Sequence, residues 1–226
     1  MSTPASASRR PAAAARALGG GGLLALALAG CSLLGGGERE PVTIYAPDPR
    51  VTVDASAPAV DWQLAMAAPQ AARIVDSVRI AVRPTPGELE VYRGASWAKP
   101  PPDMLQDALL RALEDSGRIP AVARQGSGIA ADYKLVLDVR RFEADYAGSA
   151  VPSAVIEFNA KLIHSGDQLI VAAHTFRHAE PASGTAVGLV ADAFSRGLER
   201  VTGELAHWVL RTGDQHLRQA HPEAVR

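Results

Sequence analysis

The sequence is poor in three kinds of residue on which common functions depend. It has one cysteine, Cys31, among 226 residues. A single cysteine can form no internal disulfide and cannot build a cysteine-based zinc site. Aromatic residues make up only 5%, and 23 basic residues against 24 acidic ones leave a formal net charge of −1. This composition lacks the basic footprint and the stacking aromatics of nucleic-acid-binding proteins, so no nucleic-acid partner is expected.

Long hydrophobic runs are also missing, but a short one follows a basic N-terminus. Arg9, Arg10 and Arg16 precede four glycines and the apolar run 23–30, and no acidic residue occurs before position 31. That run is shorter than the roughly 20 residues that a transmembrane helix requires. A basic region followed by a short apolar region is typical of a secretory signal, which we assign to residues 1–30.

The signal ends in Leu28-Ala29-Gly30-Cys31, which resembles the bacterial lipoprotein box. The resemblance implies diacylation of the Cys31 sulfur, cleavage before that residue and acylation of the new amine. Several acyl chains on one residue give a stable membrane anchor, where one chain binds only marginally. Ser32 follows the cysteine; by resemblance to enterobacterial sorting, this implies the outer membrane, with the protein facing the periplasm. The alternative for Cys31 is a small buried core residue.

The mature chain is expected to have three parts. Residues 31–43 include Gly35-Gly36-Gly37 and are small and polar. They predict a lipidated N-terminus and a flexible tether with a reach of roughly 20 Å. The folded domain is expected over 44–212, and the polar residues 213–226 are expected to form a frayed tail.

Hydrophobic periodicity predicts an α+β fold. Alternating apolar residues indicate half-buried strands over 77–83, 133–139, 154–162 and 169–178, and the last three predict an antiparallel meander. The turn 84–87 predicts a hairpin between 77–83 and 89–92, and 121–124 predicts a further short strand. Residues 70–76 fit either a short helix or a loop.

Two helices are expected at the 3.6-residue period. The first runs from an Asp103 N-cap to Gly117, and the second spans about 186–210. One apolar sheet face and one apolar stripe on each helix predict a two-layer sandwich, a mostly antiparallel sheet packed against two helices.

No residue pattern indicates catalysis or a metal site. His174 and His178 are four residues apart, but on a predicted strand and without a nearby carboxylate, so packing is favoured over metal binding. Ser127 lies between two glycines, yet it lacks the flanking residues of a nucleophile elbow. A hydrolase would need a nucleophile paired with a base, and the sequence shows no pattern that identifies such a pair. No cofactor is expected.

Charged and aromatic residues of the strands have structural explanations that compete with functional ones. The acidic residues are expected to form exposed ion pairs with the basic residues nearby. The arginines could face anionic head groups or a partner, although a solvated face is the simpler explanation. Trp97 precedes three prolines and either packs in the core, which is favoured, or offers a docking ridge. The charged residues are Asp138, Glu143 and Glu157, with Arg140, Arg141 and Lys161 nearby, and Arg79 and Arg83.

The order of these landmarks resembles the ABC-type transport auxiliary lipoprotein family. They are Tyr92-Arg93, Trp97-Ala98, the helix 104–117, the strands 133–137 and 154–162, the run 172–182 and the final Trp208-Val209. The resemblance covers about residues 43–210.

The family implies a non-catalytic envelope lipoprotein that works with an ABC system carrying a mammalian-cell-entry-domain protein. Such systems are linked to lipid movement between the inner and outer membranes. The family carries no defined catalytic residues. A structural lipoprotein that activates a cell-wall or secretion complex stays open as the alternative. A homo-oligomer is compatible with edge strands that need covering.

Overall fold

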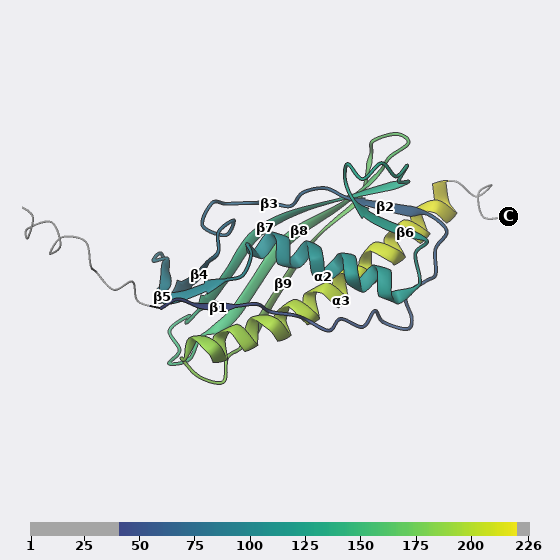
Figure 1. Cartoon of the computed structure of the whole chain (residues 1–226). Coiled ribbons are helices and arrows are strands. Elements are labelled where there is room, and N and C mark those ends of the chain that lie inside the picture. Colours follow the sequence, from purple (N-terminus) through teal and green to yellow (C-terminus); the bar gives the residue numbers. More distant parts are fainter. Residues whose placement is uncertain (1–40, 221–226) are drawn as a thin grey trace, which may run out of the picture. The chain divides into compact units, whose positions relative to one another are not determined.

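The computed structural model describes residues 41–220, which form one nine-stranded sheet and two helices (Figure 1). The strands are β1 (Thr43–Tyr45), β2 (Gln63–Met66), β3 (Gln70–Ala71), β4 (Arg79–Arg83), β5 (Glu90–Trp97), β6 (Ala121–Arg124), β7 (Tyr133–Asp145), β8 (Ser153–His164) and β9 (Ile170–Pro181). The helices are α2 (Pro101–Ser116) and α3 (Val187–Ala220). The α+β fold class is therefore confirmed.

The antiparallel meander β7-β8-β9 forms the body of the sheet. Val139 pairs with Phe158, and Phe158 pairs with Phe176 on the next strand. Every second residue of β8 from Ala154 to Leu162 is fully buried, because this face of the sheet meets the helices. The period-two alternation in the sequence thus reports correctly which side of β8 is covered. In β9 the alternation fails at Ile170, which is 56% exposed because the register shifts between Leu162 and Ile163.

The short strands extend the sheet beyond β7. β4 and β5 form the expected antiparallel hairpin, which is joined to β7 through a parallel pairing of β4. β2 lies parallel to both β6 and β7, and β1 lies parallel to β5. The segment 70–76, expected as a helix or loop, contributes the two-residue strand β3. Parallel neighbours come from distant parts of the chain, so no local pattern could reveal them.

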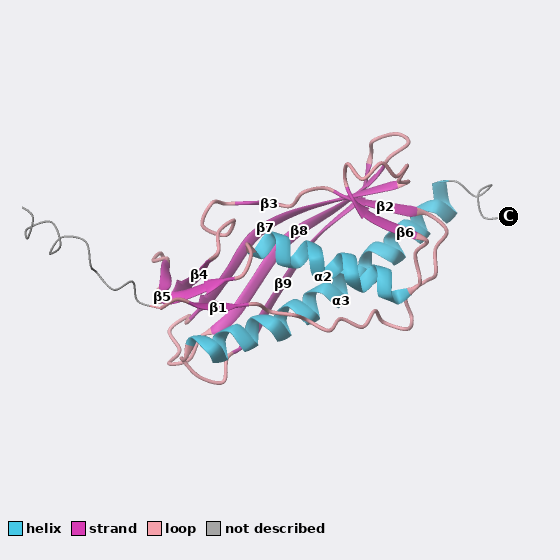
Figure 2. Cartoon of the chain, in the orientation of Figure 1, coloured by secondary structure: helices cyan, strands magenta, loops and turns pink. Residues whose placement is uncertain are grey.

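Both helices lie on the same face of the sheet (Figure 2). Helix α2 begins at Pro101 and has prolines in its first turn, where their missing N–H groups are not needed. The predicted Asp103 N-cap is wrong: Pro100 occupies the cap, no side chain caps the helix, and Asp103 lies in the first turn. Gly117 ends the helix in the left-handed conformation, as predicted, with φ of 60°.

Helix α3 continues to Ala220, ten residues beyond its expected end at 210. The prediction of a frayed tail from 213 is therefore wrong as far as 220, and 221–226 lie outside the described residues. The extra turns are held by tertiary contacts. Gly213 is buried against the ring of Trp62, and the hydroxyl of Tyr133 lies 2.9 Å from Nδ1 of His216. Neither helix is long and apolar enough to cross a membrane.

An aromatic cluster fills the core between the sheet and the helices. Phe142 of β7 stacks on Phe194 of α3 with ring centroids 4.5 Å apart, and Trp97 packs edge-on against both rings. Trp97 is only 2% exposed, which confirms core packing and excludes a docking ridge. No helix within residues 41–220 covers the opposite face of the sheet (Figure 2).

Candidate functional site

The lipidation residue predicted from the sequence, Cys31, lies outside the described residues. Pro41 is the first described residue, and its carbonyl oxygen lies 3.8 Å from the position that a Cβ would take on Gly94 in β5. Gly94 has φ of +62°, which places it in the left-handed region that side chains disfavour. The chain therefore enters the domain beside β5.

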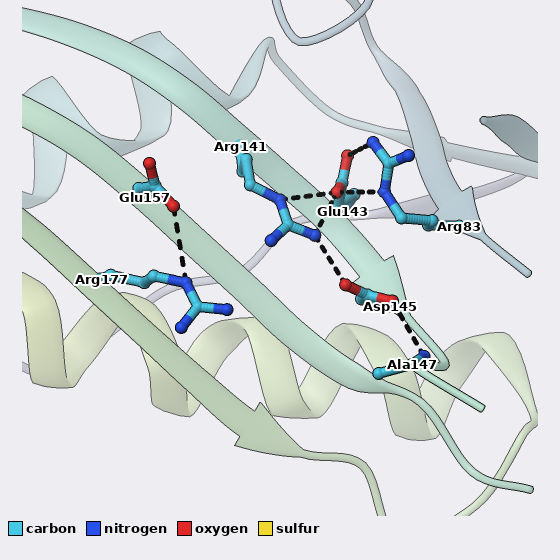
Figure 3. Close-up of polar contacts among 7 residues, drawn as sticks. All are labelled: Arg83, Arg141, Glu143, Asp145, Ala147, Glu157 and Arg177. Carbon is cyan, nitrogen blue, oxygen red and sulfur yellow. Dashed lines mark hydrogen bonds and ion pairs between the residues drawn. The ribbon is translucent and has the colours of Figure 1, made fainter. Parts of the chain in front are cut away.

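A charged cluster occupies the uncovered face of the sheet (Figure 3). The side chain of Glu143 is only 4% exposed and lies between two arginines. Arg83 Nε donates to Glu143 Oε1 at 2.8 Å, and Arg141 Nη2 donates to the same oxygen at 2.6 Å. Arg141 also donates to Asp145 at 2.6 Å. The expectation of an exposed pair at Glu143 is wrong, since the guanidinium groups on both sides shield the carboxylate from water.

Hydrogen bonds within the cluster stabilise the charged form of its two arginines. The hydrogen bond to Glu143 raises the pKa of Arg83. Burial disfavours the charged form of Arg141, but hydrogen bonds to Asp145 and Glu143 outweigh burial and raise the pKa of its guanidinium. Two of the four arginines considered for anionic head groups are therefore engaged within the fold. Arg79 is exposed at the start of β4.

The expectation of exposed cross-strand pairs holds only in part for the other two acidic residues, because Asp138 pairs with Arg140 along its own strand and Glu157 is only 21% exposed. Asp138 accepts from Arg140 at 3.5 Å, and both side chains are about half exposed. Glu157 pairs across the strands with Arg177 at 3.5 Å, in place of the expected Lys161 (Figure 3). Exposed pairs of this kind contribute little to stability, and their geometry gives no catalytic arrangement.

The two histidines of β9 serve different contacts. His178 Nε2 lies 3.1 Å from Glu180, which also accepts from Arg196 at 2.9 Å. These hydrogen bonds hold the pKa of the Glu180 carboxyl below its ordinary value. The His174 ring instead packs against Phe176, with centroids 4.6 Å apart. In the described part of the chain, no group of three or more His, Cys, Asp or Glu residues could hold a metal ion.

A cleft of about 620 Å³ opens between β9, α3 and the segment 52–54. Its floor includes Phe176 and Gly203, and His174 lines one side. Charges of both signs line it, among them an Arg200–Glu204 pair at 3.1 Å. No sequence pattern indicates this cleft, because only tertiary packing brings the loop before β2 against the last helix. Its mixed charge and open form favour no particular small ligand.

Ser127 makes local contacts in the turn after β6. Its hydroxyl and its backbone N–H both donate to the carbonyl oxygen of Arg124.

Comparison with known proteins identifies the family. Residues 43–206 match the ABC-type transport auxiliary lipoprotein component family, and the chain belongs to it. The match covers nearly the whole described domain, from β1 into α3. It confirms the resemblance drawn from the order of sequence landmarks.

Individual proteins are similar to the chain in sequence or in fold. The crystal structure of protein XCC0632 from Xanthomonas campestris is 57% identical, with a TM-score of 0.77, and covers 79% of this chain and 100% of that one. An uncharacterised protein, bll6063 from Bradyrhizobium diazoefficiens, is 25% identical over 181 residues, 78% of this chain. The chain spans about half the length of that curated relative. A further uncharacterised crystal structure, 14% identical with a TM-score of 0.58, covers 75% of this chain and 99% of its own and shares the fold.

Proposed function

We propose that this protein is a non-catalytic lipoprotein, anchored in the outer membrane through Cys31, that assists an ABC system in lipid trafficking between the two membranes. The observation that carries the proposal is the family match over residues 43–206, directly behind a lipoprotein box. The proposed partner is a mammalian-cell-entry-domain protein of that ABC system, which the domain contacts from the periplasmic side.

The arrangement of the described domain supports an auxiliary role. On the uncovered sheet face, Glu143 binds both Arg83 and Arg141, and Arg141 also binds Asp145. Ser127 and His174 stand in separate structural contacts and share no hydrogen bond. Such a domain offers surfaces for protein partners, including further copies of itself, and an attachment point for the membrane.

The test is mild crosslinking in the native host, followed by affinity capture through the C-terminus and mass spectrometry. We expect an ABC permease or a mammalian-cell-entry-domain protein among the captured proteins, and a triacylated Cys31 as the mature N-terminus. A Cys31→Ala chain is the control: it should leave the membrane fraction and capture less of the partner.

Two results would contradict the proposal. Capture of a cell-wall synthase alone would favour the alternative, a lipoprotein that activates a cell-wall or secretion complex. Normal outer-membrane lipid asymmetry and detergent resistance in a clean deletion strain without a paralogue would argue against lipid trafficking.

A further inference from the structure

Three turns of the domain lie together at one end of the sheet. Val82 pairs with both Glu90 and Ala144, Ala144 pairs with Ala154, and Ala154 pairs with Glu180. These pairs form one row across β5, β4, β7, β8 and β9. The β4–β5, β7–β8 and β9–α3 connections all project beyond this row, on the left in Figure 1. We name this end the entry end, because β1, which follows Pro41 and runs beside β5, starts on the same side (Figure 1).

The entry end combines exposed apolar side chains with few charges. Val42 is 57% exposed, and Leu89, Val151 and Leu189 are each 37–39% exposed at the three connections. The connections 84–89, 146–152 and 182–186 contain a single charged residue, Glu88. Two carboxylates at this row are paired, Asp145 with Arg141 and Glu180 with Arg196, whereas Glu90 beside Leu89 is exposed.

The opposite end has a similar content of charged and apolar residues. The β8–β9 turn exposes Leu169 at 65% and Ile170 at 56%. It contains one acidic residue, Asp167, which pairs with His164, and the neighbouring turns of α3 carry an Asp214–Arg218 pair. Charged groups oppose entry into a lipid interface because they lose water there. Since ion pairs occur at both ends, the attachment point of the chain, and not the charge, distinguishes the two ends.

The attachment point restricts which end can reach a membrane. Nine residues, 32–40, separate Cys31 from Pro41. Fully extended, they span at most about 30 Å, and an average coil of this length spans about 15–18 Å. A sheet strand of 12 residues, such as β9, is itself about 40 Å long. With Cys31 in the bilayer, the tether easily allows the entry end to reach the lipid, whereas an upright domain with the β8–β9 turn toward the lipid would place Pro41 about 40 Å away, beyond the extended length of the tether.

From this geometry we infer that the entry end docks on the membrane surface, with Leu89, Val151 and Leu189 inserted among the lipid head groups. The inference rests on the proposed anchoring through Cys31. The lipid surface it fits is mainly zwitterionic, since the entry end has no excess of basic residues to select anionic lipids. Docking would fix the orientation of the domain, and the uncovered sheet face and the cleft beside β9 would then stand at the side, open to partners.

The inference is tested with the full-length lipoprotein in vesicles of phosphatidylethanolamine and phosphatidylglycerol. Acylation blocks the thiol of Cys31, so Val151→Cys and Leu169→Cys each provide one free thiol for an environment-sensitive fluorophore. We expect lipids carrying a nitroxide to quench the label at position 151 at least twofold more than the label at 169. The two positions are exposed turn residues at opposite ends, which makes them matched probes.

Flotation of the same samples separates the two proposals. Protein that floats with the vesicles but shows equal quenching at both positions, or stronger quenching at 169, would overturn the docking and leave the anchor intact. Protein that does not float would overturn the anchor, and the docking that depends on it. Flotation with selective quenching at 151 supports both.

Discussion

Alanine at Gly213 should destabilise the domain, although alanine is the better helix former. Exchanging glycine for alanine inside a helix stabilises by about 1 kcal/mol. At this position an added Cβ would lie 2.3 Å from Cζ2 and 2.8 Å from Cε2 of Trp62. Carbon atoms pack best at about 3.5–4.0 Å, so the indole ring would have to move by more than about 1 Å.

The ring of Trp62 has little room for that movement. It is 3% exposed and packs edge-on against Tyr133, with ring centroids 4.8 Å apart. Overpacking of a filled core costs about 1–3 kcal/mol, and a conflict this short belongs at the upper end. After the gain in helix propensity is subtracted, we expect Gly213→Ala to lose about 2 kcal/mol.

Gly203 in the same helix provides the matched control. An added Cβ there would meet only the Thr52 carbonyl oxygen and a Val51 methyl group, both at 3.8 Å, which is ordinary contact. Gly203→Ala should therefore be neutral or stabilising by up to about 1 kcal/mol. The two variants should differ by about 2–3 kcal/mol, or about 4–12 °C in Tm for a domain of this size.

Urea titration and thermal unfolding of both variants measure this difference. If Gly213→Ala proves as stable as the parent chain, Trp62 does not pack on the last turns of α3, and the account of why the helix continues past 210 fails. Large destabilisation by Gly203→Ala would place the segment 51–52 closer to the helix than described.

Two further predictions concern charges. Glu143→Gln should destabilise by about 1–3 kcal/mol in urea titration, because it leaves the partly buried Arg83 without a carboxylate and Arg141 with Asp145 alone. The exposed Asp138→Asn should stay within about 0.5 kcal/mol, and equal losses in the two variants would contradict the burial argument. Burial disfavours the charged form of Asp107, but hydrogen bonds from Lys99 and Arg124 outweigh it and lower its pKa. The carboxylate therefore stabilises the fold above its unfolded pKa of about 4, and this stability is lost as the pH falls through the lower folded pKa. The free energy of unfolding, measured from pH 7 into acid, should be lower for Asp107→Asn than for the parent chain at pH 7 and the same for both in acid. A difference in stability that persists in acid would refute this explanation.

The sequence alone determined the long strands, the two helices and the covered side of β8. Alternation over β7, β8 and β9 and the helical stripe of α3 depend on local periodicity, which burial imposes on neighbouring residues. Gly117 marked the end of α2 for a similar local reason, since few other residues tolerate its backbone conformation. The large ring of Trp97 likewise predicted its place in the core.

Tertiary structure decided what depends on residues distant in sequence. The parallel pairings of β1, β2, β3 and β4 join segments between which no periodicity runs. Glu143 appears exposed by its residue type, but arginines from two strands shield it. Helix α3 continues past its expected end because Gly213 packs against the ring of Trp62, which lies about 150 residues earlier in the chain. The clustering of apolar turns at the entry end follows from strand register in the same way, because register, set by packing across the whole sheet, decides which turns become neighbours.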